Sequence, residues 1–156
     1  MRCMIEICRK HDESLKLDRD TLCRQHIKDI SFHRGLLDGL DFSYSVLENI
    51  DFRSAQMNNA HFVNAVLDNS RLIMVKSRGA FFDGCNFGKS LLLHSDFSGS
   101  SFRGADLSEC IIKNVVFSKC DLRGADLSCA GLETCILDGI IYDDSTVWNK
   151  NLEKDV

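Results

Sequence analysis

The side chains in this chain best suited to metal or redox chemistry are its eight cysteines and five histidines. Zinc sites use thiolates and imidazoles in closely spaced pairs along the chain. No Cys-x-x-Cys pair occurs: Cys3 and Cys8 are five residues apart, and no two histidines stand at a ligand spacing. The sequence therefore predicts neither a metal site nor a cofactor.

Aspartate is the other candidate for chemistry, because paired carboxylates can act as general acid and base. Asp recurs directly before a large apolar residue at Asp41, Asp51, Asp96, Asp106, Asp121 and Asp126. These positions resemble a known repeat motif that favours Asp or Asn there, which implies a solvated or turn-stabilising role instead of an active site. The glycines are spaced singly and form no phosphate-binding loop. We expect the protein not to be an enzyme.

A strict five-residue period positions all of these side chains. From Leu22 to Leu152 every fifth residue is apolar or aromatic except Ser77, and nine of the ten phenylalanines fall on this register. Neither a helix nor an ordinary strand has this period. A fixed short repeat is typical of a solenoid, in which each unit supplies one inward large residue.

A second inward position lies two residues before each large one and is usually small. Four cysteines occupy it, namely Cys85, Cys110, Cys120 and Cys135. Free cysteine behaves as a small apolar residue, so these four are predicted to be buried thiols. Cys8 or Cys129 is the candidate for an exposed thiol. Unpaired cysteines favour a reducing, cytoplasmic location.

Segments such as Ala105-Asp106-Leu107-Ser108 and Cys120-Asp121-Leu122-Arg123-Gly124 resemble the pentapeptide-repeat family. The resemblance covers roughly residues 20–152. It implies an all-β fold, the right-handed quadrilateral parallel β-helix, with four units per coil and about six to seven coils. Residues twenty apart would then stack, as in the column Phe42, Phe62, Phe82, Phe102, Leu122 and Tyr142.

Three regions are expected along the chain: an N-terminal cap over 1–20, the β-helix over 21–148 and a tail over 149–156. A solenoid needs its ends covered. Met1–Cys8 fits a strand that starts the first coil, and Asp12–Gln25 fits a short helix or an irregular cap. Trp148 is predicted to cover the last coil, leaving no room for a dimerising helix.

Charge and hydropathy limit the partners. The formal net charge is −4, which argues against nucleic-acid binding because that needs a basic face. No apolar stretch is long enough for a membrane helix, and charge interrupts the N-terminus too early for a secretory signal. The polar centre Ser77, between Lys76 and Arg78, is either a basic bulge or a small residue tolerated through a hydrogen bond or a water.

The outward positions carry one signal of interaction. Coils of twenty residues would gather aliphatic side chains on one wall, with more on the adjoining wall, giving the possible interface Ile73, Leu91, Leu93, Ile111, Val116 and Ile136. Exposed apolar clusters mark interaction sites, although such ladders also stabilise a sheet.

The function favoured by these observations is a non-enzymatic scaffold, bacterial and cytoplasmic, that binds a protein partner or a second copy of itself, possibly as a homodimer. The family resemblance adds a DNA mimic that protects DNA gyrase or topoisomerase from quinolones or toxins. Modest charge, no insertion between units and no dimerising helix count against that alternative. A bacterial effector is a further one.

Overall fold

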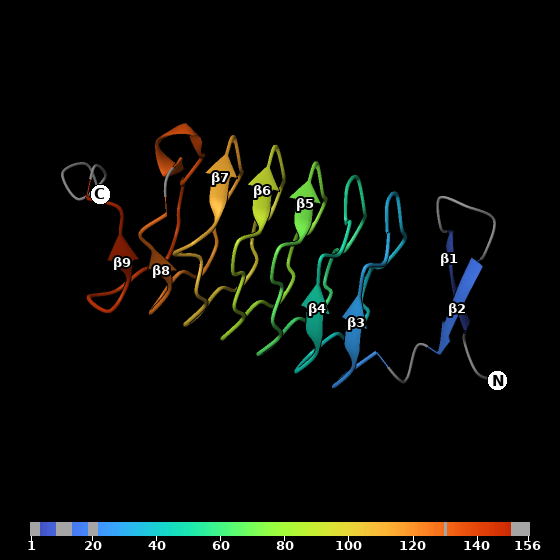
Figure 1. Cartoon of the computed structure of the whole chain (residues 1–156). Helices are drawn as coiled ribbons and strands as arrows, with labels where there is room; N and C mark the ends of the chain where they lie inside the picture. Colours follow the sequence, from blue (N-terminus) through green and yellow to red (C-terminus); the bar gives the residue numbers. More distant parts are fainter. Residues whose placement is uncertain (1–3, 9–13, 19–21, 130, 151–156) are drawn as a thin grey trace.

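The computed structural model describes residues 4–8, 14–18, 22–129 and 131–150. Short strands follow one another along a rod (Figure 1), with a single turn of 3-10 helix near the C-terminal end among the described residues. The elements are β1 (Met4–Cys8), β2 (Ser14–Asp18), β3 (His26–Lys28), β4 (Val46–Glu48), β5 (Arg71–Ile73), β6 (Leu91–Leu93), β7 (Ile111–Lys113), β8 (Asp126–Leu127), η2 (Leu132–Thr134) and β9 (Val147–Trp148).

Parallel pairing between residues twenty apart builds the solenoid. Strand β3 pairs with β4, and β5, β6 and β7 form a three-stranded sheet. Isolated bridges continue the same spacing on all four walls, from Ser31 with Asp51 to Asp121 with Ile141. Four five-residue units therefore complete one coil, which confirms the predicted right-handed quadrilateral β-helix.

The core is a column of stacked aromatic rings. Phe42, Phe62, Phe82 and Phe102 are fully buried, with successive centroids 4.9, 5.0 and 4.9 Å apart and rings close to parallel. Phe97 meets Phe82 and Phe102 edge-on at 5.6 and 5.5 Å. Stacked and edge-to-face contacts are both favourable for aromatic pairs. The five-residue pattern predicted these inward positions correctly.

The recurring aspartates complete the backbone hydrogen bonding. In the unit 51–55 four N–H groups donate to backbone carbonyls, while the N–H of Arg53 donates to the Asp51 carboxylate at 3.1 Å. All six recurrent aspartates accept a bond from the N–H two residues later. Because backbone groups need partners, Asp at this position stabilises the turn, as the sequence predicted.

Hydroxyls at the small inward position tie successive coils together. The Ser95 hydroxyl donates to the Leu72 carbonyl at 2.8 Å and accepts the N–H of Val75 at 3.1 Å. The Ser100 hydroxyl bonds to the Ser77 carbonyl and the Ala80 N–H in the same way. No buried side-chain nitrogen or oxygen lacks a partner in the described part of the chain.

At the N-terminal end, β1 and β2 form an antiparallel hairpin beyond the first coil (Figure 1). The expectation that Met1–Cys8 is a strand that starts the first coil is right for the strand at Met4–Cys8, but among the described residues this strand pairs antiparallel with β2 and not with a coil. The prediction of a short helix between Asp12 and Gln25 is wrong for Ser14–Asp18, because this segment is a β-strand paired with β1. A cap formed by residues 1–20 stays a prediction, and the tail beyond residue 150, including Leu152, lies outside the described residues.

The five-residue register slips by one residue in the last coil. Strand β9 pairs Trp148 with Leu127, so the spacing is twenty-one. Val147, predicted to point inward, is 47% exposed as a result. Tyr142, also predicted to point inward, precedes the slip, since Ile141 still bridges Asp121, and its 45% exposed ring meets that of Trp148 with centroids 5.5 Å apart. The slip comes from a turn in which the Asp143 carboxylate accepts the N–H and hydroxyl of Ser145, at 3.0 and 2.6 Å. Trp148 consequently packs against the core in place of Val147.

Candidate docking face

Four of the predicted interface residues lie together on the outer side of the β5–β6–β7 sheet. The parallel register places Leu91 beside Ile111, and Ile73 beside Leu93. Leu72, Leu92 and Ile112 point inward from the same strands and are buried. Alternation along each strand therefore aims one residue at the core and its two neighbours outward.

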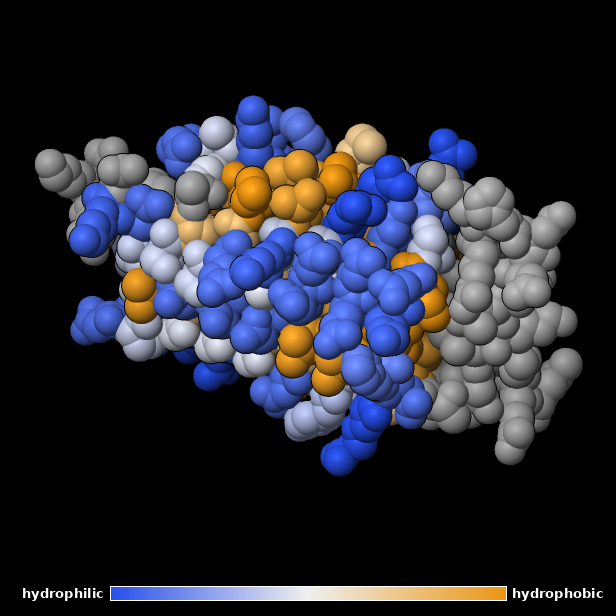
Figure 2. Space-filling view, viewed as in Figure 1, coloured by the Kyte–Doolittle hydropathy of each residue, from blue (hydrophilic) through white to orange (hydrophobic). Residues whose placement is uncertain are grey.

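These side chains are accessible from outside. Ile111 is 58% exposed, whereas Ile73, Leu91 and Leu93 are half-buried by one another. Met74 follows β5 at the corner and is 56% exposed. Figure 2 shows the resulting apolar patch over β5–β7, bordered by polar side chains. We call Ile73, Met74, Leu91, Leu93 and Ile111 the apolar patch.

The other two predicted residues lie on the adjoining wall. Val116 bridges to Ile136 twenty residues later, and Ile136 is 48% exposed. Between them and the apolar patch the chain turns at Asn114, which has a positive φ of 52°. Val116 and Ile136 thus form a second, smaller cluster around a corner instead of extending the same flat surface.

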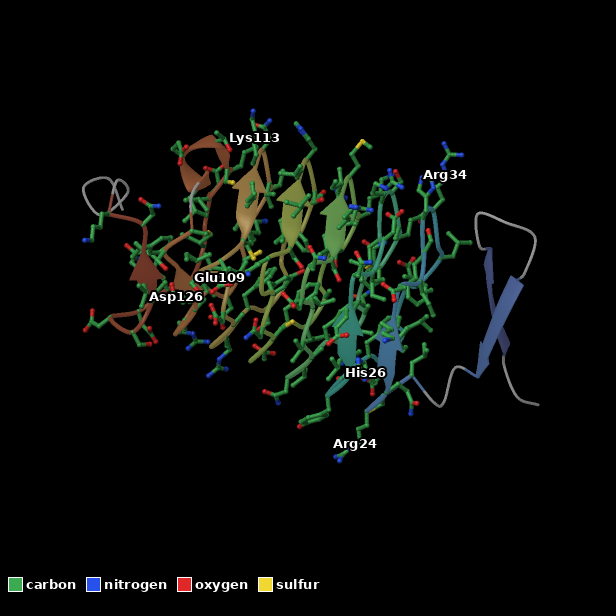
Figure 3. The ribbon with its side chains drawn as sticks, viewed as in Figure 1. Arg24, His26, Arg34, Glu109, Lys113 and Asp126 are labelled. Atoms are coloured by element: carbon green, nitrogen blue, oxygen red, sulfur yellow. The ribbon has the colours of Figure 1, made fainter. Side chains whose placement is uncertain are left out.

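Two basic residues flank the apolar patch on the β5–β7 wall: the sequence places Arg71 only near the basic spot at Ser77, and it does not single out Lys113. Arg71 stands beside Leu91, and Lys113 stands beside Leu93. Figure 3 shows Lys113 pointing away from β7, on a different side from Glu109 and Asp126. The twenty-residue stacking would have revealed both neighbours if applied to charged as well as apolar positions.

Charges are distributed unequally among the walls. The wall that carries the patch has Arg34, Arg53, Arg71 and Lys113 against Asp51 and Glu133. The wall that precedes it in the coil, with β3, β4 and β8, carries six acidic residues (Asp29, Glu48, Asp68, Asp106, Glu109 and Asp126) against Lys28 and Lys89. The apolar patch therefore lies on a net basic wall beside a net acidic one.

The acidic wall holds a shallow depression lined by Glu48, Asp68, Asp106 and Glu109 together with Val66, Asn86, Gly88 and Ser108. No group of histidine, cysteine and carboxylate side chains suited to a metal ion occurs among the described residues. The described part of the chain also has no helix long and apolar enough to cross a membrane.

The polar centre Ser77 is fully buried, and its hydroxyl contacts the Met57 carbonyl at 3.5 Å. Of the two interpretations of Ser77, this geometry agrees with a small residue that is tolerated in the core through a hydrogen bond. Its basic neighbours Lys76 and Arg78 line a second depression with Asn58, Asn59 and Gly79. Arg78 is held by Asp96, with its Nη2 2.6 Å from the carboxylate.

The cysteines are packing residues in the coils. Cys85, Cys110 and Cys120 are buried as predicted, and Cys135 is half-buried. Burial raises the pKa of the Cys120 thiol to about 12, despite backbone hydrogen bonds from Ser100 and Gly99 that lower it. Cys129 is also buried, so its predicted exposure is wrong. The side chain of Cys8 is outside the described part.

The pentapeptide-repeat family, described as "Pentapeptide repeats", matches this chain in eight copies over residues 36–72, 78–108 and 100–139. These segments cover more than half of the sequence and coincide with the regular coils. The chain belongs to the pentapeptide-repeat family. No curated protein sequence matches it.

Several solved structures are similar. Rfr23, a pentapeptide repeat protein from the cyanobacterium Cyanothece 51142, is 19% identical, with 80% of this chain and 91% of that chain covered and a TM-score of 0.43. A pentapeptide repeat protein of the Arabidopsis thaliana thylakoid lumen is 23% identical, with coverage of 71% and 70% and a TM-score of 0.44.

QnrB1, a plasmid-mediated fluoroquinolone resistance protein, is 13% identical, with coverage of 77% of this chain and 90% of that chain and a TM-score of 0.42. At these identities the similarity concerns the fold alone.

Proposed function

We propose that this protein is a non-enzymatic scaffold that binds another protein through the β5–β7 wall. The observation that carries the proposal is the apolar patch, whose aliphatic side chains are gathered by strand register on a flat sheet. Contiguous exposed apolar surface is typical of interaction sites on soluble proteins. The buried, unpaired cysteines are consistent with a cytoplasmic scaffold.

The experiment compares a double variant with a matched control. Leu91→Asp with Leu93→Asp places two carboxylates in the patch, and both positions face outward, so the coil should still form. Val63→Asp with Val66→Asp makes the same change at half-buried outward positions on two other walls. Circular dichroism and thermal melting establish that all three proteins are folded.

Partner binding is then measured by quantitative capture from the native cell, and self-association by light scattering after gel filtration. We expect the wild type and the control to retain the same bound protein or the same dimer, and the Leu91/Leu93 variant to lose it. Identical captured proteins and identical mass for the folded double variant would contradict the proposal.

The acidic wall favours one second candidate, a DNA mimic acting on gyrase. B-DNA carries about one negative charge per 1.7 Å of axis, or about 17 over the roughly 29 Å of six coils at strand spacing. The whole chain has a formal net charge of −4. This charge density is several-fold too low for close mimicry, so we rank the candidate second.

Its test is a supercoiling assay with purified gyrase, with and without a quinolone. Protection by micromolar protein, lost when Asp68 and Asp106 are changed to Asn, would support the DNA mimic. Unchanged supercoiling and unchanged quinolone inhibition would exclude it.

A further inference from the structure

The outward side chains of β5, β6 and β7 form two parallel rows with a cation at opposite corners. Strand register gives the rows Arg71, Leu91, Ile111 and Ile73, Leu93, Lys113. The two leucines occupy the middle of the array. A line from Arg71 to Lys113 therefore passes from a cation, over aliphatic side chains, to a second cation.

Both cations are available to a partner. Among the described residues, neither Arg71 nor Lys113 takes part in an ion pair. Asp51 stands next to Arg71 in the ladder, but Arg53 holds both of its carboxylate oxygens, at 2.8 and 2.6 Å. Glu133 follows on η2 and likewise forms no ion pair within the described part.

This arrangement disfavours a second copy as the occupant. Two copies meeting patch to patch would bring four cations into one interface with no carboxylate from the patch opposite them. Removing charges from water without a counter-charge is costly, whereas opposite potentials across an interface give specificity and faster association. The missing component is therefore a surface with carboxylates around an aliphatic centre.

We propose that the β5–β7 wall takes an acidic amphipathic helix of a partner protein, with carboxylates on Arg71 and Lys113 and aliphatic side chains on Leu91 and Leu93. The inference rests on the proposed function and specifies the chemistry of the partner. The expected ligand of the β5–β7 wall is therefore a protein segment with two acidic residues, one on each side of a group of apolar residues.

The spacing determines the helix pattern. Arg71 and Lys113 are separated by two strand spacings across the sheet, about 10 Å, and by two residues along the strand direction, about 7 Å. The diagonal distance between the two cations is therefore about 12 Å. A helix rises 1.5 Å per residue, so this distance corresponds to acidic residues about seven or eight positions apart. Residues three and four positions after the first acid lie on the same helix side, where they meet Leu91 and Leu93.

The probe is a synthetic, lactam-stapled helical peptide with glutamate at positions i and i+7 and leucine at i+3 and i+4. Two matched peptides carry glutamine or lysine in place of both glutamates. Each is titrated into isotope-labelled full-length protein, and amide shifts are followed by NMR. We expect shifts centred on 71–73, 91–93 and 111–113, with the glutamine peptide about fivefold weaker and the lysine peptide weaker still.

The Arg71→Gln/Lys113→Gln variant should bind the glutamate and glutamine peptides equally and remove the salt dependence. Both side chains are exposed, so the fold should be unaffected. Lys76→Gln/Lys119→Gln changes two exposed lysines on the adjoining wall and should leave the preference for glutamate intact. Equal binding of all three peptides by wild type, shifts on another wall, or no binding would overturn the inference.

Failure of this inference and failure of the proposed function give different results. If a cellular partner is lost on changing Leu91 and Leu93 but is retained by the Arg71/Lys113 variant, the scaffold function stands and the acidic partner is wrong. If the partner is indifferent to both variants, both are wrong.

Discussion

Asp121 illustrates how one side chain satisfies the backbone of a corner. Its carboxylate accepts the N–H of Arg123 at 3.2 Å and is bridged by the guanidinium, with Nε at 2.9 Å and Nη2 at 2.5 Å. The hydrogen bond from the Arg123 side chain, opposed by burial, holds the pKa of Asp121 below its ordinary value of 3.8. Asp51 and Arg53 repeat the arrangement.

The first prediction concerns this corner. Asp121→Ala leaves the Arg123 N–H without its acceptor and should lower the free energy of unfolding by about 1 kcal/mol. Asp121→Asn keeps a side-chain oxygen at the same place and should cost less than half as much. Urea denaturation of both variants measures the difference. Equal losses would show that the ion pair, and not the backbone bond, is what matters.

Thiol burial gives a second prediction at the residue scale. Desolvation raises the pKa of Cys120 and of Cys129, each to about 12, and also raises that of Cys85 well above its ordinary value. At pH 8 these thiols should stay unlabelled by iodoacetamide in the native protein and react once it is denatured. Peptide mapping by mass spectrometry reads each site. Rapid native labelling of Cys120 would contradict its placement in the core.

At the scale of elements, the β5–β7 sheet ends at η2 instead of continuing into a fourth strand. The Thr134 hydroxyl accepts the N–H of Asn114 at 2.8 Å and donates to the Gly131 carbonyl at 2.7 Å. Gly131 has a φ of 102°, and a Cβ there would overlap the Ile112 carbonyl oxygen. An edge covered in this way is protected from pairing with another chain.

Gly131→Ala should therefore disrupt the last coil. The backbone strain and the contact with Ile112 together predict a loss of about 2 kcal/mol or more, with faster amide exchange in 131–148 than in 42–110. Gly99→Ala is the control, because Gly99 also has a positive φ, 69°, but nothing lies within 4 Å of the added Cβ. A Gly131 variant no less stable than the Gly99 variant would contradict the close approach.

For the whole molecule, stability is distributed along the coils because each coil contacts only its neighbours. The carboxylates of the corners make that stability depend on pH. The pKa of Asp51 is lowered by hydrogen bonding to Arg53, against burial. At Asp96 burial opposes the shift, but hydrogen bonds from Ser98 and Arg78 outweigh it and the pKa is again lowered.

A lowered pKa in the folded state stabilises the protein above the unfolded value of 3.8 and ceases to do so as the pH falls through the folded value. We expect these groups to leave the melting temperature constant from pH 7 to about 5 and to lower it below about pH 4. Asp51→Asn/Asp121→Asn should show a shallower acid decline in a thermal-melt series. A steeper fall of the melting temperature with acid in that variant would contradict the assignment of the acid sensitivity to Asp51 and Asp121.

The period of five in the sequence determined which side chains face inward, because a residue's direction within each unit is a local property. It thereby specified the phenylalanine column and the buried cysteines at the small position, and the resemblance to the repeat motif added the role of the recurrent aspartates. The strand at Ser14–Asp18 and the burial of Cys129 did not follow, since the period of five specifies neither the hairpin pairing nor the burial of a residue at a corner.

The twenty-residue stacking predicted the apolar patch and, applied to charged positions, would also have placed Arg71 and Lys113 beside it. Only the tertiary structure showed that neither cation forms an ion pair among the described residues, because that depends on how the neighbouring carboxylates are engaged. The slip at Asp143–Ser145 likewise exchanged Val147 for Trp148 in the core. The local five-residue pattern decides whether a side chain points into the core or outward. Pairing between coils and the geometry of the corners decide which outward side chains lie next to one another.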